Sequence, residues 1–422
     1  MNEQANAEAR SPLGYWPTIN ALYHQQYRQS GLVTQLFAGR GAIDKALLNR
    51  ALQEAQSHHP LLHCRIIEED RQFVFEPDVM PDVTAIEFRS TDGQTGFDIA
   101  EQLMGEGVGE RLWRIVFVES TKGENCWYLI MLCHHAICDA QSTSALLEDL
   151  LETYVAMEQG AKAKRPSPSR SVSPAGLAAT VSEQESRASD CSVESEWPIA
   201  QFAPLDKRRV RWVKVPLNPD ILDSLLSSCR REKVSLTNLI AAALIRASGQ
   251  RDCCRVSTAI DFRNRFEPPV KRDQFGCFIG MVESTIPTAE GIWEQARQCR
   301  LYQFQKSDSA VRSAVAKPAK LVLKTLMMSR ISNSLQQGNF AAGCAVSNLG
   351  VLQIPERIGS LHIDEIQFTS PQLAGLYSLF LSVVSHAGRI YMSISYADPL
   401  LSTGDIQNLM QKFVGELTAC CP

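Results

Sequence analysis

The residues with the clearest capacity for chemistry are two adjacent histidines and an aspartate, His134, His135 and Asp139, in the run HHAICD. Imidazole changes its charge near neutral pH and is therefore the side chain best suited to accept and return a proton. An aspartate four positions after His135, across a tight turn, can point back into the fold, so we expect Asp139 to fix the loop and not to relay charge. A buried carboxylate needs a cation, and both Arg263 and Arg265 are candidates.

The segments on either side of this motif predict how it is positioned. Residues 127–133 are strongly apolar, and apolar residues recur at helical spacing over 146–154, which predicts a buried strand, a tight turn and a helix. A strand-like run at 112–119 and turn residues at 121–125 come before them, so an antiparallel hairpin is expected to deliver the histidines. Successive strand residues face opposite sides, which places His135 toward a cleft and gives His134 a supporting role.

Three other interpretations of the motif stay open from the residues alone. The two histidines can be structural, with their ring nitrogens satisfied at a strand end. Cys133 and Cys138 can join them and Asp139 as metal ligands, but the spacing does not match closed zinc sites, so no metal is predicted. Cys138 can also pair with a histidine as a nucleophile.

Length and composition are those of an ordinary globular protein. The chain has 422 residues, 45% hydrophobic and 21% charged, with a formal net charge of -4, which gives no indication of a nucleic-acid surface. The polar, acidic start is not a secretory signal, and the longest apolar run, 373–384, is too short to span a bilayer. The 13 cysteines are odd in number and lack regular spacing, which predicts reduced thiols and a cytoplasmic protein.

A serine-rich stretch at 161–196 divides the chain into two similar halves. It contains no aromatic residue and is too polar to order itself around a core. We therefore predict an N-terminal lobe at 1–160, a partly flexible linker at 161–204 and a C-terminal lobe at 205–422. Both halves mix helical and strand patterns, which predicts an α+β fold of two facing layers. Helices are expected at 42–57, after 218–220 and from Ser235 to Ile245, and further strands at 209–217, 255–262, 277–286, 342–347, 378–385 and 389–396.

The motif and several other segments resemble a known family. HHAICD is similar to the HHxxxD motif of the superfamily of chloramphenicol acetyltransferase, condensation domains of peptide synthetases, polyketide-associated acyltransferases and plant BAHD acyltransferases. The companion segments follow in the family's order and span nearly the whole chain outside the linker. They are HPLL at 59–62, LWR at 112–114, DFRNRFEPP at 261–269, FGCFIG at 275–280 and SNLG at 347–350.

The resemblance implies two chloramphenicol acetyltransferase-like lobes, each a mixed sheet with helices, with an active-site tunnel between them. It implies an acyltransferase of secondary metabolism that moves groups other than amino-acyl from a thioester to a small-molecule alcohol or amine, forming an ester or an amide. His135 would be the general base, without an acyl-enzyme, and Asp139 with Arg263, favoured over Arg265, would be structural. Ser347 and Asn348 are candidates to donate a hydrogen bond to the oxyanion or to bind the substrate, or they are simply turn residues. The acyl group would arrive on coenzyme A or on the phosphopantetheine of an acyl-carrier protein, with no bound cofactor.

Three departures from the family pattern leave alternative functions open. Ala140 replaces the usual glycine after the aspartate, the DFGWG segment of plant members is missing, and the asparagine of the condensation-domain "GxFxN" stretch is replaced near Gly280 and Met281. An inactive protein that binds a ligand or a carrier, and a hydrolase that uses water as acceptor, are therefore alternatives. The two-lobed architecture needs no second subunit to complete its site, which suits a monomer but leaves the oligomeric state open.

Overall fold

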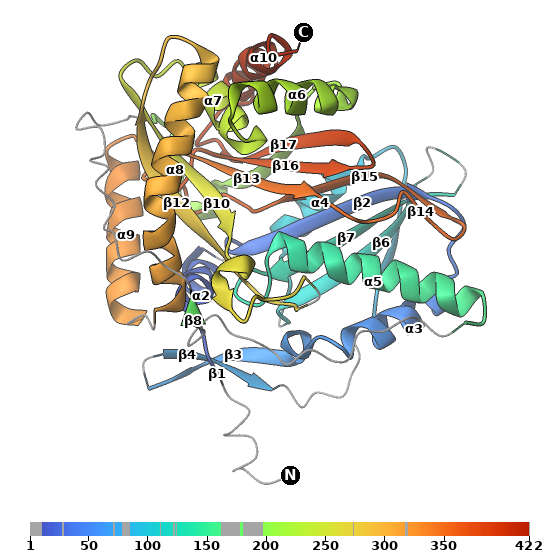
Figure 1. Cartoon of the computed structure of the whole chain (residues 1–422). Coiled ribbons are helices and arrows are strands. Elements are labelled where there is room, and N and C mark those ends of the chain that lie inside the picture. Colours follow the sequence, from blue (N-terminus) through green and yellow to red (C-terminus); the bar gives the residue numbers. More distant parts are fainter. Residues whose placement is uncertain are drawn as a thin grey trace.

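Two six-stranded mixed sheets, each covered by helices, form the body of the molecule in the computed structural model (Figure 1). The structure describes residues 11–421 except 28, 71, 78–84, 110, 121–122, 124, 162–177, 180–196, 273 and 317–319. Within the predicted linker at 161–204 it therefore covers Ala161, the short strand β8 (Ala178–Ala179) and the stretch from Trp197 onward. The rest of that prediction lies outside the described residues.

The first sheet holds the hairpin that ends in the histidines. Its order is β14-β15-β2-β7-β6-β5, and β7 pairs antiparallel with both β2 and β6. Residues of β7 from Leu129 onward are buried without alternation because helices cover both faces of the sheet. The strands are β2 (Leu32–Arg40), β5 (Glu87–Thr91), β6 (Trp113–Ser120), β7 (Cys126–His134), β14 (Arg357–Ile358) and β15 (Leu361–Thr369).

The second sheet comes entirely from the second half of the chain. Its order is β12-β10-β13-β16-β17-β9, with parallel pairing on both sides of β13 and antiparallel pairing elsewhere. The strands are β9 (Arg209–Lys214), β10 (Cys253–Asp261), β12 (Ile279–Pro287), β13 (Cys344–Val351), β16 (Leu379–His386) and β17 (Arg389–Asp398). Short pieces complete the strands: β1 (Ser11–Pro12), β3 (Cys64–Glu69) and β4 (Gln72–Pro77) form a small sheet, and β11 (Phe266–Glu267) pairs with β8.

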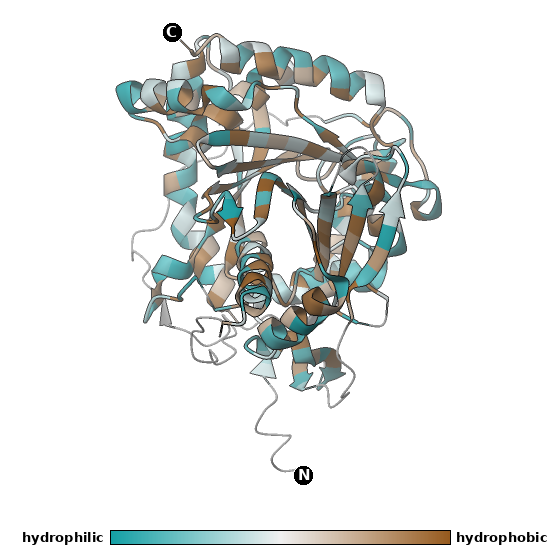
Figure 2. Ribbon diagram, turned by 90° about the vertical axis from the view of Figure 1, so that its right-hand side faces the viewer, coloured by the Kyte–Doolittle hydropathy of each residue, from teal (hydrophilic) through white to brown (hydrophobic). Residues whose placement is uncertain are grey.

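Helices bury the apolar faces of the two sheets, and brown, hydrophobic positions accordingly gather on the strands between them (Figure 2). On the first sheet, α3 and α5 pack on one face and α4 on the other. On the second, α6, α7 and α10 form the outer layer, with α8 and α9 at the side (Figure 1). The helices are α2 (Tyr15–Tyr27), α3 (Lys45–Gln56), α4 (Gly96–Glu106), α5 (Ala140–Glu158), α6 (Leu222–Glu232), α7 (Leu236–Ser248), α8 (Ile292–Val315), α9 (Lys320–Gln336) and α10 (Thr403–Thr418).

Two strands of the second half of the chain, β14 and β15, belong to the first sheet, so the first sheet extends across the predicted division of the chain at 205. Strand β15 belongs to the second half of the sequence but pairs with β2 in the first sheet. Trp212 of β9, also in the second half, packs against Phe97 of α4, with ring centroids 4.6 Å apart. Between the sheets, Phe368 and Phe380 meet edge to face at 6.4 Å. These contacts join both lobes in continuous hydrophobic cores.

Most of the predicted elements are confirmed, with shifted ends. The hairpin before His134 is β6–β7, and Ser235 caps α7 by accepting a hydrogen bond from the Asn238 amide. The predicted strand at 209–217 ends at Lys214, and the helix predicted after 218 starts as a single 3-10 turn before α6. The elements that were not predicted include helices α2, α4, α8, α9 and α10 and strands β2, β5 and β15. Among the described helices, none has both the length and the apolar character to cross a membrane.

Candidate active site

The end of β7 fixes the backbone of the two histidines. His134 donates its amide hydrogen to the carbonyl of Leu112 at 2.6 Å, and His135 donates to the carbonyl of Gly31 at 2.7 Å. The chain then turns, with the Ile137 amide bonded to the His134 carbonyl at 3.0 Å, and α5 begins after Asp139. Strands on both sides of β7 therefore hold the position of His135.

The imidazole of His135 is held in one tautomer. Its Nδ1 lies 2.8 Å from the carbonyl oxygen of Cys138. A carbonyl can only accept a hydrogen bond, so Nδ1 carries the proton and Nε2 keeps a free lone pair. Burial lowers the pKa of His135, although the Cys138 carbonyl and the charge of Asp139 act in the opposite direction. The ring is therefore neutral at neutral pH and can act as a base.

His134 has a different environment and is suited to a structural role. It is 2% exposed, and its ring packs against His24 with centroids 4.6 Å apart. Its Nδ1 accepts a hydrogen bond from the Ala136 amide at 3.0 Å. Burial lowers the pKa of His134 well below its usual value, and His24 and His135 lower it further. A neutral His134 thus supports the turn on which His135 stands.

Asp139 joins the two lobes at the base of this turn. As the N-cap of α5 it accepts a hydrogen bond from the Ser142 amide at 2.9 Å, and its other oxygen accepts one from the Phe278 amide at 2.9 Å. The guanidinium of Arg263 lies 2.9 Å from each carboxylate oxygen. Burial raises the pKa of Asp139, but Arg263 and the two amides outweigh burial and hold that pKa below its usual value.

The arginine beside Asp139 is thus Arg263, while Arg265 pairs with Asp308. Arg263 also bonds to the Ser142 hydroxyl at 3.0 Å and to the carboxylate of its neighbour Asp261 at 3.1 Å. The Ser142 hydroxyl in turn donates to the Gly276 carbonyl at 2.8 Å. These bonds satisfy both terminal nitrogens of Arg263 and both oxygens of Asp139, while the buried Arg263 Nε has no partner within the described residues. Such additional bonds are the condition under which a buried ion pair is tolerated.

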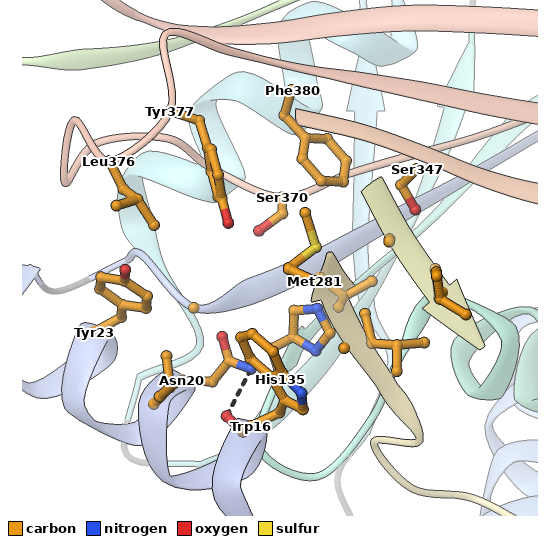
Figure 3. Close-up of a pocket in the computed structure, with 18 of the residues that line it drawn as sticks. Trp16, Asn20, Tyr23, His135, Met281, Ser347, Ser370, Leu376, Tyr377 and Phe380 are labelled. Atoms are coloured by element: carbon orange, nitrogen blue, oxygen red, sulfur yellow. Dashed lines mark hydrogen bonds between the residues drawn. The ribbon is translucent and has the colours of Figure 1, made fainter. Parts of the chain in front are cut away.

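His135 faces a cavity of about 610 Å³ that both lobes line. Figure 3 shows His135 facing the same space as Trp16 and Asn20 of α2 and Met281 of β12. Strands β10, β13 and β16, helices α8 and α9 and the loop before β16 also contribute to the wall. A cavity of this size holds a small molecule and part of a thioester arm. That it opens at both ends, as a tunnel, stays a prediction.

Ser347 and Asn348 both line this cavity, but their side chains differ in availability. The Asn348 amide donates one hydrogen bond to the Thr237 hydroxyl at 3.1 Å, and its carbonyl oxygen accepts one from the Gly350 amide at 2.8 Å. One N–H of that amide is left for a ligand. The Ser347 hydroxyl lies on the cavity wall (Figure 3). Their role as donors to an oxyanion stays a prediction.

The cysteines near His135 are poorly suited to be nucleophiles. Cys138 is fully buried, and burial raises its pKa well above the usual value, as do the thiol and charge of Cys133. Cys277 approaches Nδ1 of His135 at 3.8 Å, but burial also raises the pKa of this thiol. In the described residues, no group of three or more His, Cys, Asp and Glu side chains is arranged to hold a metal ion.

Helices α8 and α9 of the cavity wall were not predicted, and neither was α2. Helix α2 contributes Tyr15, Trp16, Asn20 and Tyr23 to the cavity wall. The aromatic residues before the first strand are a signal for a lining element, but their spacing mixes polar and apolar positions on each face. Gly280, in the segment that departs from the family pattern, lies directly behind Trp16, and a Cβ there would come within 2.4 Å of the indole nitrogen.

Comparison with known proteins agrees with this geometry. Residues 21–173 match the family model of the condensation domain. A stretch of 347 residues, 75% of the chain, is 25% identical to cyclosporin synthetase simA of Tolypocladium inflatum, of whose length it spans 2%.

Solved structures share the fold along nearly the whole chain at low sequence identity. The TRI3 trichothecene 15-O-acetyltransferase from Fusarium sporotrichioides superposes with a TM-score of 0.72 at 12% identity, covering 98% of this chain and 95% of that one. The epimerization domain from the third module of tyrocidine synthetase B gives 0.67 at 14%, covering 97% of each chain. Polyketide synthase associated protein 5 from Mycobacterium tuberculosis gives 0.63 at 14%, covering 97% and 98%. The condensation-domain match thus covers residues 21–173, including the turn with His135, and the chain as a whole shares the two-lobed fold of these solved structures.

Proposed function

We propose that this protein is an acyltransferase that moves an acyl group from a thioester to the hydroxyl or amine of a small molecule. The observation that supports it most is the state of His135. Its Nδ1 proton is engaged with the Cys138 carbonyl, which leaves the lone pair of Nε2 as the basic atom of a ring that faces the cavity. A neutral imidazole in a largely desolvated cavity is the group needed to deprotonate an attacking nucleophile.

In the proposed reaction, the oxygen or nitrogen of the acceptor attacks the thioester carbonyl while its proton is transferred to Nε2 of His135. The tetrahedral intermediate then collapses, the C–S bond breaks, and the leaving thiolate takes the proton back from Nε2. General-base assistance contributes roughly 10²–10⁴ in rate. Ser347 and the remaining N–H of Asn348 are the proposed hydrogen-bond donors to the oxyanion. One such donor contributes a factor of roughly 10²–10³ to the rate.

The proposal contains no acyl-enzyme. Cys138 and Cys277 are buried thiols with raised pKa values, which favours direct transfer over a covalent intermediate on either. The donor is coenzyme A or the phosphopantetheine of a carrier protein. The named activity of the TRI3 protein is acetyl transfer to an oxygen, which supports a hydroxyl acceptor without excluding an amine. A cytoplasmic location is part of the proposal, supported by the free thiols of the described cysteines.

A thiol-release screen tests this function. Purified protein is given acyl-coenzyme A donors of increasing chain length, or the same acyl groups on a carrier protein, with mixtures of alcohols and amines. The expected result is free thiol that appears only when donor and acceptor are both present, together with an ester or amide in the mass spectrum. Thiol release without an acceptor would indicate a hydrolase, and donor binding without release across the whole panel would indicate an inactive binding protein.

A further inference from the structure

A second polar cluster lies in the same cavity, on elements other than the histidine turn. It consists of Tyr23 of α2, Tyr377 of the loop before β16, Glu283 of β12 and Arg330 of α9, all of which line the cavity. Figure 3 shows the hydroxyls of Tyr23 and Tyr377 turned into the space between α2 and that loop. The proposed chemistry at His135 uses none of these groups.

The two tyrosines are held in place by their surroundings. On one side of Tyr377, the Leu376 carbonyl accepts a hydrogen bond from the Ala342 amide at 2.9 Å, and on the other side the Ser378 amide donates to the Gly343 carbonyl at 2.7 Å. Tyr23 packs against Tyr27, one helical turn further on, with ring centroids 6.2 Å apart. Positioned hydroxyls of this kind can recognise a ligand at little cost in conformational entropy.

The charged groups of the cluster are engaged with one another, and Lys306 of α8, also on the cavity wall, donates to the Glu283 carbonyl at 3.1 Å. Arg330 lies 2.5 Å from the Glu283 carboxylate and also donates to the Ala341 carbonyl at 2.9 Å. Burial raises the pKa of Tyr23 and of Tyr377, so both phenols stay protonated. A ligand carboxylate would meet Glu283, and a ligand ammonium would meet Arg330. A neutral oxygen is the group that the two protonated phenols can bond without disturbing the Arg330–Glu283 pair.

The phenol hydroxyls have unused hydrogen-bonding capacity. Within the described residues, no hydrogen bond to the Tyr23 hydroxyl is found. In the same part of the chain, the buried Ser257 hydroxyl has no partner at hydrogen-bond distance, but it lies close enough to Tyr377 to lower the pKa of that phenol. Elsewhere the cavity wall is largely apolar, with Ile19, Met281, Leu376 and Phe380 among its side chains. Polar groups that face such an apolar space are stabilised when a ligand oxygen forms a hydrogen bond with them.

We propose that Tyr23 and Tyr377 bind a second oxygen of the acceptor, a hydroxyl or a carbonyl remote from the group that is acylated. The acceptor is then a neutral, mainly apolar molecule with at least two oxygen functions. Naming this ligand as the acceptor depends on the proposed acyl transfer. The binding preference itself does not, because it concerns groups that take no part in the reaction.

Calorimetric titration with simple probes tests the preference. The probes are α,ω-alkanediols of increasing length and primary n-alkanols of matched length, titrated into the wild-type protein without a thioester donor, so that no turnover occurs and His135 remains available to the first hydroxyl. At one or more lengths the diol should bind roughly three- to tenfold more tightly than the alcohol, the gain expected from one or two neutral hydrogen bonds. Tyr23→Phe and Tyr377→Phe, made separately, should each reduce this advantage, and Tyr27→Phe, on the same helix but outside the cavity wall, should keep it.

Equal binding of diol and alcohol at every length would overturn the proposal. So would undetectable binding of both, or an advantage that survives both phenylalanine variants. If the diol advantage is found while the wild-type protein releases no thiol with any acceptor, the proposed acyl transfer fails and the recognition of a doubly oxygenated ligand stands alone.

Discussion

Arg263 of the second lobe and Asp139 of the first form an ion pair with 2.9 Å between nitrogen and oxygen, and their side chains are only 4% and 1% exposed. Asp139 caps the helix that follows the histidine turn, and Arg263 directly follows the strand β10 beside the cavity. The pair therefore ties the turn that presents His135 to the opposite wall of the cavity.

Removing the arginine of this pair should destabilise the fold strongly. Arg263→Ala leaves the Asp139 carboxylate buried without its cation, a change that typically costs about 3–5 kcal/mol. Arg265→Ala is the matched control, because Arg265 pairs with Asp308 at a half-buried position and should cost about 0–1 kcal/mol. Denaturant unfolding measures both. Equal stability of the two variants would show that the buried pair does not hold the lobes together.

Gly31 should be intolerant of a side chain, although it is far from the motif in sequence. Its φ is +79°, and an added Cβ would lie 2.6 Å from the backbone carbonyl oxygen of Asn20. Because the Gly31 carbonyl accepts the His135 amide hydrogen, Gly31→Ala should lower both stability and thiol release. Gly249→Ala is the control: its φ is +71° with nothing within 4 Å of the added carbon, so only the left-handed strain of roughly 1–2 kcal/mol applies.

Equal losses of stability in the two glycine variants would contradict the close approach at Gly31. A Gly31→Ala protein with full thiol-release activity would contradict its part in positioning His135. Unfolding curves and initial rates, measured on the same preparations, separate the two effects.

Cys138 is excluded as a nucleophile if it can be replaced without loss of thiol-release activity. Its side chain is buried, and His135 bonds to its backbone carbonyl, which any residue supplies. Cys138→Ala should therefore keep thiol-release activity within roughly tenfold of the wild type, since nucleophilic catalysis by a thiol would be lost completely. An acylated Cys138 peptide in the mass spectrum of the wild-type protein would contradict direct transfer.

The turn and its two flanking elements could be predicted because their determinants are local. The apolar run of β7, the turn before it and the leucines of α5 each specify their own conformation. The elements that complete the cavity could not. Helix α2 carries Asn20 and Tyr23 toward the cavity, so it lacks the clean apolar stripe that marks a helix against a core.

Contacts between segments distant in sequence could not be predicted either. Strand β15 crosses to the first sheet because it pairs with β2, a partner more than 300 residues away that no local pattern identifies. The choice of Arg263 over Arg265 has the same origin. The two residues sit on one 3-10 turn and point to different partners, Asp139 and Asp308, which only the packing of the lobes decides.

The pH dependence of the reaction should reflect the lowered pKa of His135. Neutral imidazole is the active base, so kcat/KM should rise with pH and reach a plateau once His135 is deprotonated. Burial lowers the pKa of His135 from the usual 6.5, and the midpoint of the rise should therefore lie below pH 6.5. A rate profile with its lower midpoint at or above that pH would mean that another group is titrating, or that His135 is more hydrated than its burial indicates.

The most direct measurement is acceptor-dependent thiol release by His135→Ala beside the wild-type protein, with the exposed His63→Ala as a matched histidine control. Loss of the Nε2 base should slow release by roughly 10²–10⁴ while the melting temperature stays close to that of the wild type, and His63→Ala should retain full activity. Undiminished release by folded His135→Ala would contradict the assignment of this imidazole as the base of an acyl transfer.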